Sequence, residues 1–320
     1  MRFKGGFELS QCHGIDNQHD LPEIRVDGRG NYFLRQALNL DVNDSYMPSS
    51  RMGSVRSYSG SVHSLWSGKD FCLFMRDGSL MRLNDDLKTA SLIRSGLDPS
   101  APMRYCQVLD EVYYSNNQVI ALIRNGQSRN CPEVTQRFKA PLPAGHLLEF
   151  WKGRIYVVSD RTAIFSDALV FYQYDRRRNF KLFPSRITMF CGVRDGIWVS
   201  DSGKTYFMAG EAPGEMKLVQ KADYPAFQGA IRVDGASVKG DIDGDVVVWN
   251  SPKGFCIGTG DGSFKNLTEE HYRGGQGEMG FGFHRSLPGM NQYIITSKNQ
   301  SVSVSAVPFG IAGTMAAELN

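Results

Sequence analysis

The chain has 320 residues, a formal net charge of +3 and a hydrophobic fraction of 41%. This length and composition allow a sizeable core, and the weak positive charge does not predict nucleic acid or an anionic membrane as an obligate partner. Thirty-four glycines and 13 prolines favour a fold with many tight turns over a helical one. The opening residues lack the apolar stretch of a signal peptide, and no apolar run reaches the about 18 residues of a membrane helix, so neither is expected.

The first 52 residues do not follow the pattern of the rest of the chain. The run NYFLRQALNLDV (31–42) is compatible with a strand or a short helix, and its flanks carry Gly, Asn, Asp and Pro. We interpret residues 1–52 as an extended N-terminal arm that lies on the main domain or on a partner protein.

From residue 71 onward the sequence repeats. Six runs each consist of a stretch rich in β-branched and aromatic residues, a short polar turn and a second such stretch, which is the pattern of a β-hairpin. Their starting points are separated by roughly 41 to 49 residues, which is the blade period of a β-propeller. The equivalent positions are Phe71, Val112, Ile155, Ile197, Val246 and Tyr293.

One more strand-like run precedes each of these hairpins, and a fourth follows most of them. The preceding runs span residues 62–66, 103–110, 146–153, 188–196, 236–244 and 279–286. The following runs span residues 89–94, 169–175, 215–220 and 264–268. The sequence therefore predicts an all-β, six-bladed β-propeller over residues 53–307, with seven blades as the alternative count and a C-terminal tail at 308–320.

The last predicted blade lacks an obvious fourth strand, because the chain after Ser305 is interrupted by Pro308 and Gly310. The run GSVRSYSG (53–60) has strand composition and comes just before the first blade. We therefore expect it to complete the last blade and to join the two ends of the chain without a covalent link.

Patterns for catalysis or metal binding are weak. The six cysteines are scattered without a C-x-x-C pair, which predicts free thiols in a reducing compartment. The six histidines form no zinc motif, and no nucleophile elbow, Walker loop or dinucleotide fingerprint occurs. Residues 199–206 partly resemble the Asp-box of sialidase propellers, which is a structural turn. We expect no enzyme activity, no metal and no cofactor, with glycoside hydrolysis as the least favoured alternative.

The segment FYQYDRRRNFKLF (171–183) combines aromatic and basic residues. A solvated loop or a protein contact is the favoured interpretation of its three successive arginines, and contact with phosphates is the alternative. The four tryptophans fall at similar places in successive repeats, which favours packing between blades over a stacking surface. The candidate contact patch consists of Tyr172, Tyr174, Arg176, Arg177 and Arg178.

The first 90 or so residues resemble the opening of phage tail proteins and of nozzle-like propeller proteins. Those families have a similar G-I-x-N start, an L-R-x-A-x-N-x-D segment, an R-x-G and an H-S-L-W that enters the first blade. The residues that carry the resemblance are Gly14-Ile15-Asp16-Asn17, Leu21-Pro22-Glu23, the run from Leu34 to Val42, Arg51-Met52-Gly53 and His63-Ser64-Leu65-Trp66.

The resemblance implies a virion structural protein of a phage tail, assembled in the cytoplasm of the bacterial host. Such proteins are oligomeric in the virion and have other tail proteins as partners. The chain has little beyond the propeller, which favours a tail-tip or baseplate component over a tube-forming nozzle. A tail module that binds a host receptor or a glycan is the alternative, and contact with DNA stays open.

Overall fold

The computed structural model describes residues 11–19, 24–35, 37, 40–53, 58–68, 71–238, 242–272, 280–297, 303–308 and 315–318. Regular structure in these residues is β-strand apart from one short 3₁₀ turn, η1 (Gly235–Ser237). No helix in this part of the chain is long and apolar enough to cross a lipid bilayer.

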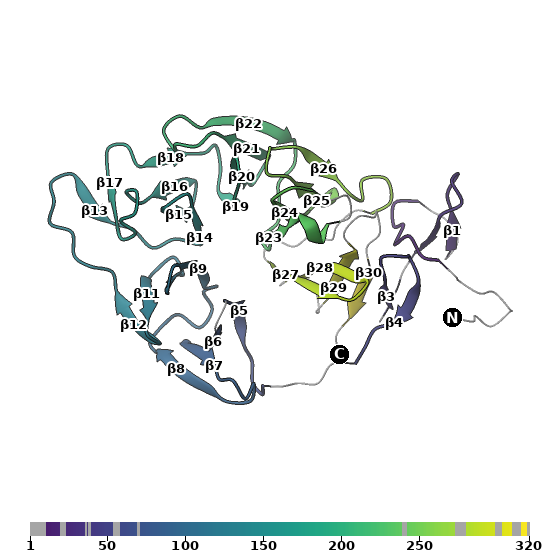
Figure 1. Cartoon of the computed structure of the whole chain (residues 1–320), viewed down its shortest axis with the longest axis horizontal. Helices are drawn as coiled ribbons and strands as arrows, with labels where there is room; N and C mark the ends of the chain where they lie inside the picture. Colours follow the sequence, from purple (N-terminus) through teal and green to yellow (C-terminus); the bar gives the residue numbers. More distant parts are fainter. Residues whose placement is uncertain are drawn as a thin grey trace. The chain divides into compact units, whose positions relative to one another are not determined.

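Six four-stranded antiparallel sheets follow one another along the described chain, and we call them blades 1 to 6 (Figure 1). Blade 1 contains β5 (His63–Ser67), β6 (Cys72–Arg76), β7 (Ser79–Leu83) and β8 (Ala90–Arg94). Blade 2 contains β9 (Arg104–Val108), β10 (Glu111–Ser115), β11 (Ile120–Arg124) and β12 (Gln127–Asn130). Blade 3 contains β14 (Leu147–Trp151), β15 (Arg154–Ser159), β16 (Thr162–Phe165) and β18 (Phe180–Leu182).

The remaining blades have the same order of strands, each paired with the one before it in the chain. Blade 4 contains β19 (Ile187–Val193), β20 (Gly196–Asp201), β21 (Thr205–Ala209) and β22 (Lys217–Ala222). Blade 5 contains β23 (Ile231–Asp234), β24 (Asp245–Ser251), β25 (Gly254–Gly258) and β26 (Phe264–Asn266). Blade 6 contains β27 (Gly280–Leu287), β28 (Met290–Ser297), β29 (Ser303–Pro308) and β30 (Met315–Glu318).

The hairpins close where the sequence supplies turn residues. Between β6 and β7, Asp77 and Gly78 have φ of 47° and 71°, and positive φ at both central residues is the signature of a type I′ turn. A Cβ at Gly78 would also lie 2.5 Å from the carbonyl oxygen of Leu97. Only glycine therefore fits this turn.

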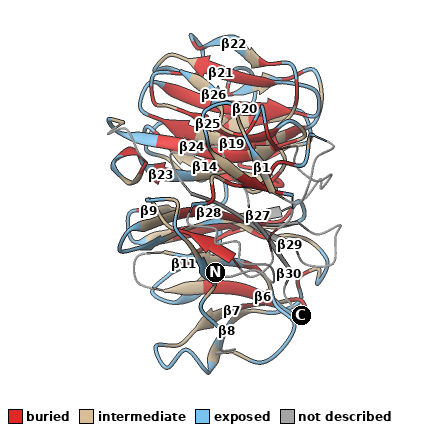
Figure 2. Cartoon of the chain, turned by 90° about the vertical axis from the view of Figure 1, so that its right-hand side faces the viewer, coloured by how far each residue is buried: buried red, intermediate tan, exposed pale blue. Residues whose placement is uncertain are grey.

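The middle strands of the blades form the core. Every residue of β20 and β25 is buried, and Figure 2 shows these strands in red. Trp198 and Trp249 are fully buried with ring centroids 5.4 Å apart, and Trp151 is buried as well. The predicted packing role is confirmed for these three tryptophans, whereas Trp66 is half-buried and stacks on Tyr105.

The chain divides into two compact units. Unit 1 comprises Met1–Gly53, Val193–Gly210 and Met216–Asn320, and it includes blades 5 and 6. Unit 2 comprises Ser54–Gly192 and Glu211–Glu215, and it includes blades 1 to 3.

The N-terminal residues form two short hairpins within unit 1. They consist of β1 (Ile24–Val26) with β2 (Tyr32–Leu34), and β3 (Leu40–Val42) with β4 (Pro48–Ser50). Leu34, Leu40 and Val42 pack into one apolar cluster with Phe255 of blade 5 and Tyr293 of blade 6. Of the two placements expected for the arm, the structure shows the one on the main domain, and the described residues among 31–42 contain strands rather than a helix.

Two buried carboxylates anchor this arm. Asp41 has a side chain only 3% exposed and lies 3.1 Å from Arg51 Nε and 2.6 Å from Arg285 Nη2 of blade 6. Asp16 is similarly buried and lies 2.9 Å from His19 Nδ1 and 3.4 Å from His271 Nδ1. Burial strengthens the ion pairs of Asp41 and the contacts of Asp16 with the two histidine rings, and it makes each carboxylate dependent on its partners.

Two predicted strands are placed differently by the structure. Residues 169–175 were expected as the fourth strand of blade 3, but β18 has that position, and Leu169 has φ of 58°, which interrupts a strand. Residues 236–244 were expected as the first strand of blade 5, but β23 has that position. Asp234 instead begins a 3₁₀ turn, where its side chain accepts a hydrogen bond from Ala236 N.

The last blade also differs from the expectation. Its fourth strand is β30, which comes from the segment 308–320 that the sequence indicated as a tail. Residues 53–60 were expected in that position, and the described residues among them form no strand. Residues 54–57 of this run, and Leu21, Pro22 and Glu23 of the opening motif, lie outside the described residues. β29 pairs with β28 on one edge and with β30 on the other.

Candidate functional site

A two-stranded ribbon accompanies blade 3. It consists of β13 (Lys139–Pro141), which comes before the blade in the chain, and β17 (Gln173–Asp175), which lies between β16 and β18. The strands are antiparallel, with Lys139 opposite Asp175. The turn after β17 carries the three successive arginines, so the ribbon and blade 3 together fix both ends of this basic segment.

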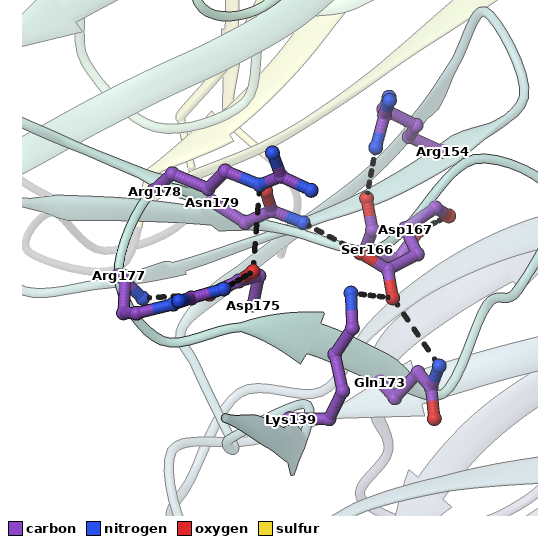
Figure 3. Close-up of polar contacts among 9 residues, drawn as sticks. All are labelled: Lys139, Arg154, Ser166, Asp167, Gln173, Asp175, Arg177, Arg178 and Asn179. Atoms are coloured by element: carbon purple, nitrogen blue, oxygen red, sulfur yellow. Dashed lines mark hydrogen bonds and ion pairs between the residues drawn. The ribbon is translucent and has the colours of Figure 1, made fainter. Parts of the chain in front are cut away.

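Asp175 organises the arginine turn. Its carboxylate is 2% exposed and accepts hydrogen bonds from the backbone N, Nε and Nη2 of Arg177, at 3.0, 3.1 and 3.0 Å (Figure 3). Arg178 Nε lies 3.4 Å from the same carboxylate. The hydrogen bonds from Arg177 hold the pKa of Asp175 well below its usual range, so the carboxylate is ionised at neutral pH.

Asp167 ties the ribbon to the blade. Its carboxylate accepts hydrogen bonds from Lys139 Nζ at 2.6 Å, Gln173 Nε2 at 3.2 Å and Asn179 Nδ2 at 2.9 Å (Figure 3). These donors come from β13, from β17 and from the residue after the arginine turn. One carboxylate therefore positions all three segments relative to one another.

Phe138 lies against the arginine turn. The carbonyl oxygen of Phe138 accepts a hydrogen bond from Arg176 N at 3.1 Å. The guanidinium carbon of Arg177 lies 4.1 Å from the centre of the Phe138 ring, and that of Arg137 lies 4.7 Å from it. Both distances are within the range of cation–π attraction.

The predicted contact patch separates into two parts. Arg176, Arg177 and Arg178 are exposed in the turn, whereas Tyr172 and Tyr174 are half-buried. Tyr174 lies opposite Ala140 in the ribbon and packs against the apolar cluster beneath it. The structure therefore brings the three arginines to the surface and gives Tyr174 a packing role.

Two exposed residues of this surface were missed from the sequence, and the buried Asp175 was not singled out. Arg137 and Phe138 lie about 40 residues before the arginine run, and their proximity depends on the pairing of β13 with β17. Such a pairing has no local signal. Asp175 was visible as the D-R-R-R start of the run, and an Asp two residues before an Arg in a turn is a recognisable capping pattern.

The other sequence candidates are structural. Asp201 Oδ1 accepts hydrogen bonds from Gly203 N and Lys204 N, at 2.9 and 2.8 Å, so the Asp-box-like segment is a turn between β20 and β21. The six cysteines, all of which belong to the described residues, form no disulfide. Within the residues that the structure describes, no three His, Cys, Asp or Glu side chains lie together as metal ligands.

Comparison with known proteins identifies the architecture. The WD40 β-propeller domain of Doa1 superposes with a TM-score of 0.52, at 10% sequence identity, over 81% of this chain and 82% of that domain. The fold is a β-propeller. The extracellular domain of the putative one-component system BT4673 from B. thetaiotaomicron matches with a TM-score of 0.50 at 9% identity, over 84% of this chain.

These likenesses extend to the fold alone, because the sequence identities are near 10%. The chain spans 34% of the length of the BT4673 structure. No protein-family model and no curated protein sequence matches the chain. The function is therefore argued from the surface of this propeller and from the resemblance of its N-terminal segment.

Proposed function

We propose that the chain is a structural component of a phage tail, at the tail tip, baseplate or nozzle, in which the propeller serves as a rigid block that binds other tail proteins. The observation that carries this proposal is the ordered basic surface beside blade 3. Asp175 and Phe138 hold Arg177 in place, so this side chain has already lost much of its freedom before a partner binds.

The anchored arm supports the same proposal. Asp16, Asp41 and Arg51 all belong to the segments that resemble phage tail proteins, and all three take part in the contacts that fix the arm within unit 1. These motif residues stabilise a rigid block, which is the property an assembly component needs.

The test is the composition of purified particles. Tailed particles produced by the source cells are purified, analysed by mass spectrometry and labelled with an antibody against this chain. We expect the chain in stoichiometric amounts and the label at one end of the tail. Particles that lack the chain while carrying a complete tail would contradict the proposal.

Binding of a host receptor or glycan is the alternative. Half-buried Tyr172 and Tyr174 present little of the flat aromatic surface on which sugars stack, so the arginines would have to carry such binding. Particles with Arg177→Ala and Tyr172→Ala that assemble normally but fail to adsorb to host cells would favour this alternative.

A further inference from the structure

An exposed basic surface surrounds the ring of Phe138. We call it the arginine corner, and it consists of Arg137, Phe138, Arg176, Arg177 and Arg178. Phe138 is 45% exposed although it is a large apolar residue. Two guanidinium groups approach it, and the backbone hydrogen bond from Arg176 N fixes it to the turn.

The backbone at Phe138 is strained. Its φ is 67°, in the left-handed region that a bulky residue rarely adopts. Strain of this kind persists only where surrounding contacts impose it, and it is concentrated at functional positions. The chain thus holds an aromatic ring at the surface in a conformation that glycine would adopt more easily.

The charged side chains that the arginine corner exposes are positive. All four arginines are exposed, whereas the side chains of Asp175 and Asp167 are only 2% and 19% exposed. Arg137 and Arg176 have no ion pair among the described residues. Asp175 occupies Nε and Nη2 of Arg177, which leaves Nη1 of this side chain and both Nη groups of Arg178 able to donate.

We propose that the arginine corner is a docking site for an acidic segment of another protein, with carboxylates on the arginines and an apolar side chain against Phe138. Guanidinium groups bind carboxylates through paired hydrogen bonds, and the exposed ring supplies an apolar anchor between them. Phe180 and Leu182 of β18, which follow the turn in the chain, are also exposed.

This chemistry favours a protein over a nucleic acid. A nucleic-acid strand needs a basic groove that follows its backbone, and the net charge of this chain is only +3. The inference deepens the proposed assembly role, and it rests on that role only for the identity of the partner.

The test is direct binding by the purified full chain. The probe is a fluorescein-labelled peptide of about twelve residues, with glutamates around a central Leu, and its binding is followed by fluorescence anisotropy. The comparison probes are the same peptide with Gln for Glu and a single-stranded oligothymidine of equal length. We expect the Glu peptide to bind about tenfold more tightly than the Gln peptide, with affinity falling as salt is added.

Variants assign the binding to the corner. Arg176→Glu with Arg178→Glu is expected to weaken binding of the Glu peptide at least about tenfold, because charges of like sign replace paired ones. Phe138→Gly relieves the backbone strain, keeps the fold and removes the anchor, so it is also expected to weaken binding. Arg129→Glu, at an exposed position on β12, is the matched control and should leave binding unchanged.

Three results would overturn the inference. They are equal binding of the Glu peptide by wild type and by the Arg176→Glu, Arg178→Glu variant, absence of binding by wild type, and tighter binding of oligothymidine than of the Glu peptide. Because no particle is involved, failure here is distinguishable from failure of the tail assignment. A chain that is present in tails but does not bind the peptide would keep the proposed function and lose this site.

Discussion

Buried serines at the ends of second strands connect successive parts of the chain. Ser115 Oγ, at the end of β10, accepts a hydrogen bond from Gly145 N and donates one to Gly145 O, both at 2.9 Å. Ser200 Oγ, near the end of β20, accepts one from Ala226 N at 2.7 Å. Each serine thus satisfies a backbone group of the segment that leads to the next blade.

Ser115→Ala tests this role. The substitution leaves Gly145 N unpaired in a buried position, and the expected loss of unfolding free energy is about 1–3 kcal/mol. Urea denaturation with and without the change measures it. Ser95→Ala, at an exposed position without such contacts, should change stability by less than about 0.5 kcal/mol. A loss no larger than that of the control would show that the serine is dispensable.

His146 makes stability depend on pH. It is 7% exposed, and its Nε2 donates to Ile187 O at 2.7 Å. Burial lowers its pKa, an effect that the hydrogen bond to Ile187 and nearby Asp160 oppose and that nearby Arg186 and Arg104 reinforce. As pH falls, the histidine is therefore protonated in the unfolded chain before it is protonated in the folded chain. The folded state loses free energy of stabilisation as pH falls below the ordinary histidine pKa, about 6.5, and keeps it above that pH.

The expected result is a lower melting temperature at pH 5 than at pH 7. His146→Gln keeps a donor toward Ile187 and should reduce this difference by up to the equivalent of about 1.4 kcal/mol per pH unit. Burial also lowers the pKa of His13 and His284, so part of the dependence should persist. The pKa of Asp261, lowered to about 2 mainly by its hydrogen bond from Thr259, affects stability only below this window. If His146→Gln leaves the difference in melting temperature between pH 5 and pH 7 unchanged, His146 is not the source of that difference.

At the scale of elements, buried charge and apolar packing both join the N-terminal hairpins to the rest of unit 1. Asp41 joins β3 to Arg51 after β4 and to Arg285 of β27. The apolar cluster beneath them is shared with blades 5 and 6. Losing the carboxylate would leave two largely buried arginines without their shared partner.

Asp41→Ala is expected to lower the unfolding free energy by about 3 kcal/mol, since it breaks a buried pair from one side. Amide hydrogen exchange should increase in β2 and β3 before it increases in blades 1 to 3. Asp85→Ala, at an exposed position, is the control. Unchanged protection of the hairpins would mean that apolar packing alone anchors them.

The sequence predicted these elements where local pattern decides the structure. The apolar runs on either side of Asp77 and Gly78 predicted a hairpin that the structure confirms. The prediction that residues 169–175 form the fourth strand of blade 3 was wrong. The positive φ of Leu169 and the pairing of β17 with β13 depend on contacts with residues distant in sequence. Within the site, the arginine run was visible, but its partners Phe138 and Asp167 became apparent only once those segments were brought together.

At the scale of the whole molecule, six repeats of one four-stranded unit account for the architecture. The propeller fold hosts many unrelated functions, so the fold alone leaves the activity open. The distinguishing features of this chain are the anchored arm and the arginine corner beside blade 3. The proposed docking site requires that the arginine corner contacts an acidic neighbour in a tail.

Photo-cross-linking from position 138 tests this contact most directly. Phe138→p-benzoylphenylalanine keeps an aromatic side chain at the corner, and the same change at Leu87, which is also exposed and has φ of 56°, provides a matched control. In assembled particles, irradiation should join position 138, and not position 87, to an acidic segment of another tail protein. Cross-links of equal yield from both positions, or none from 138 in intact particles, would contradict the account.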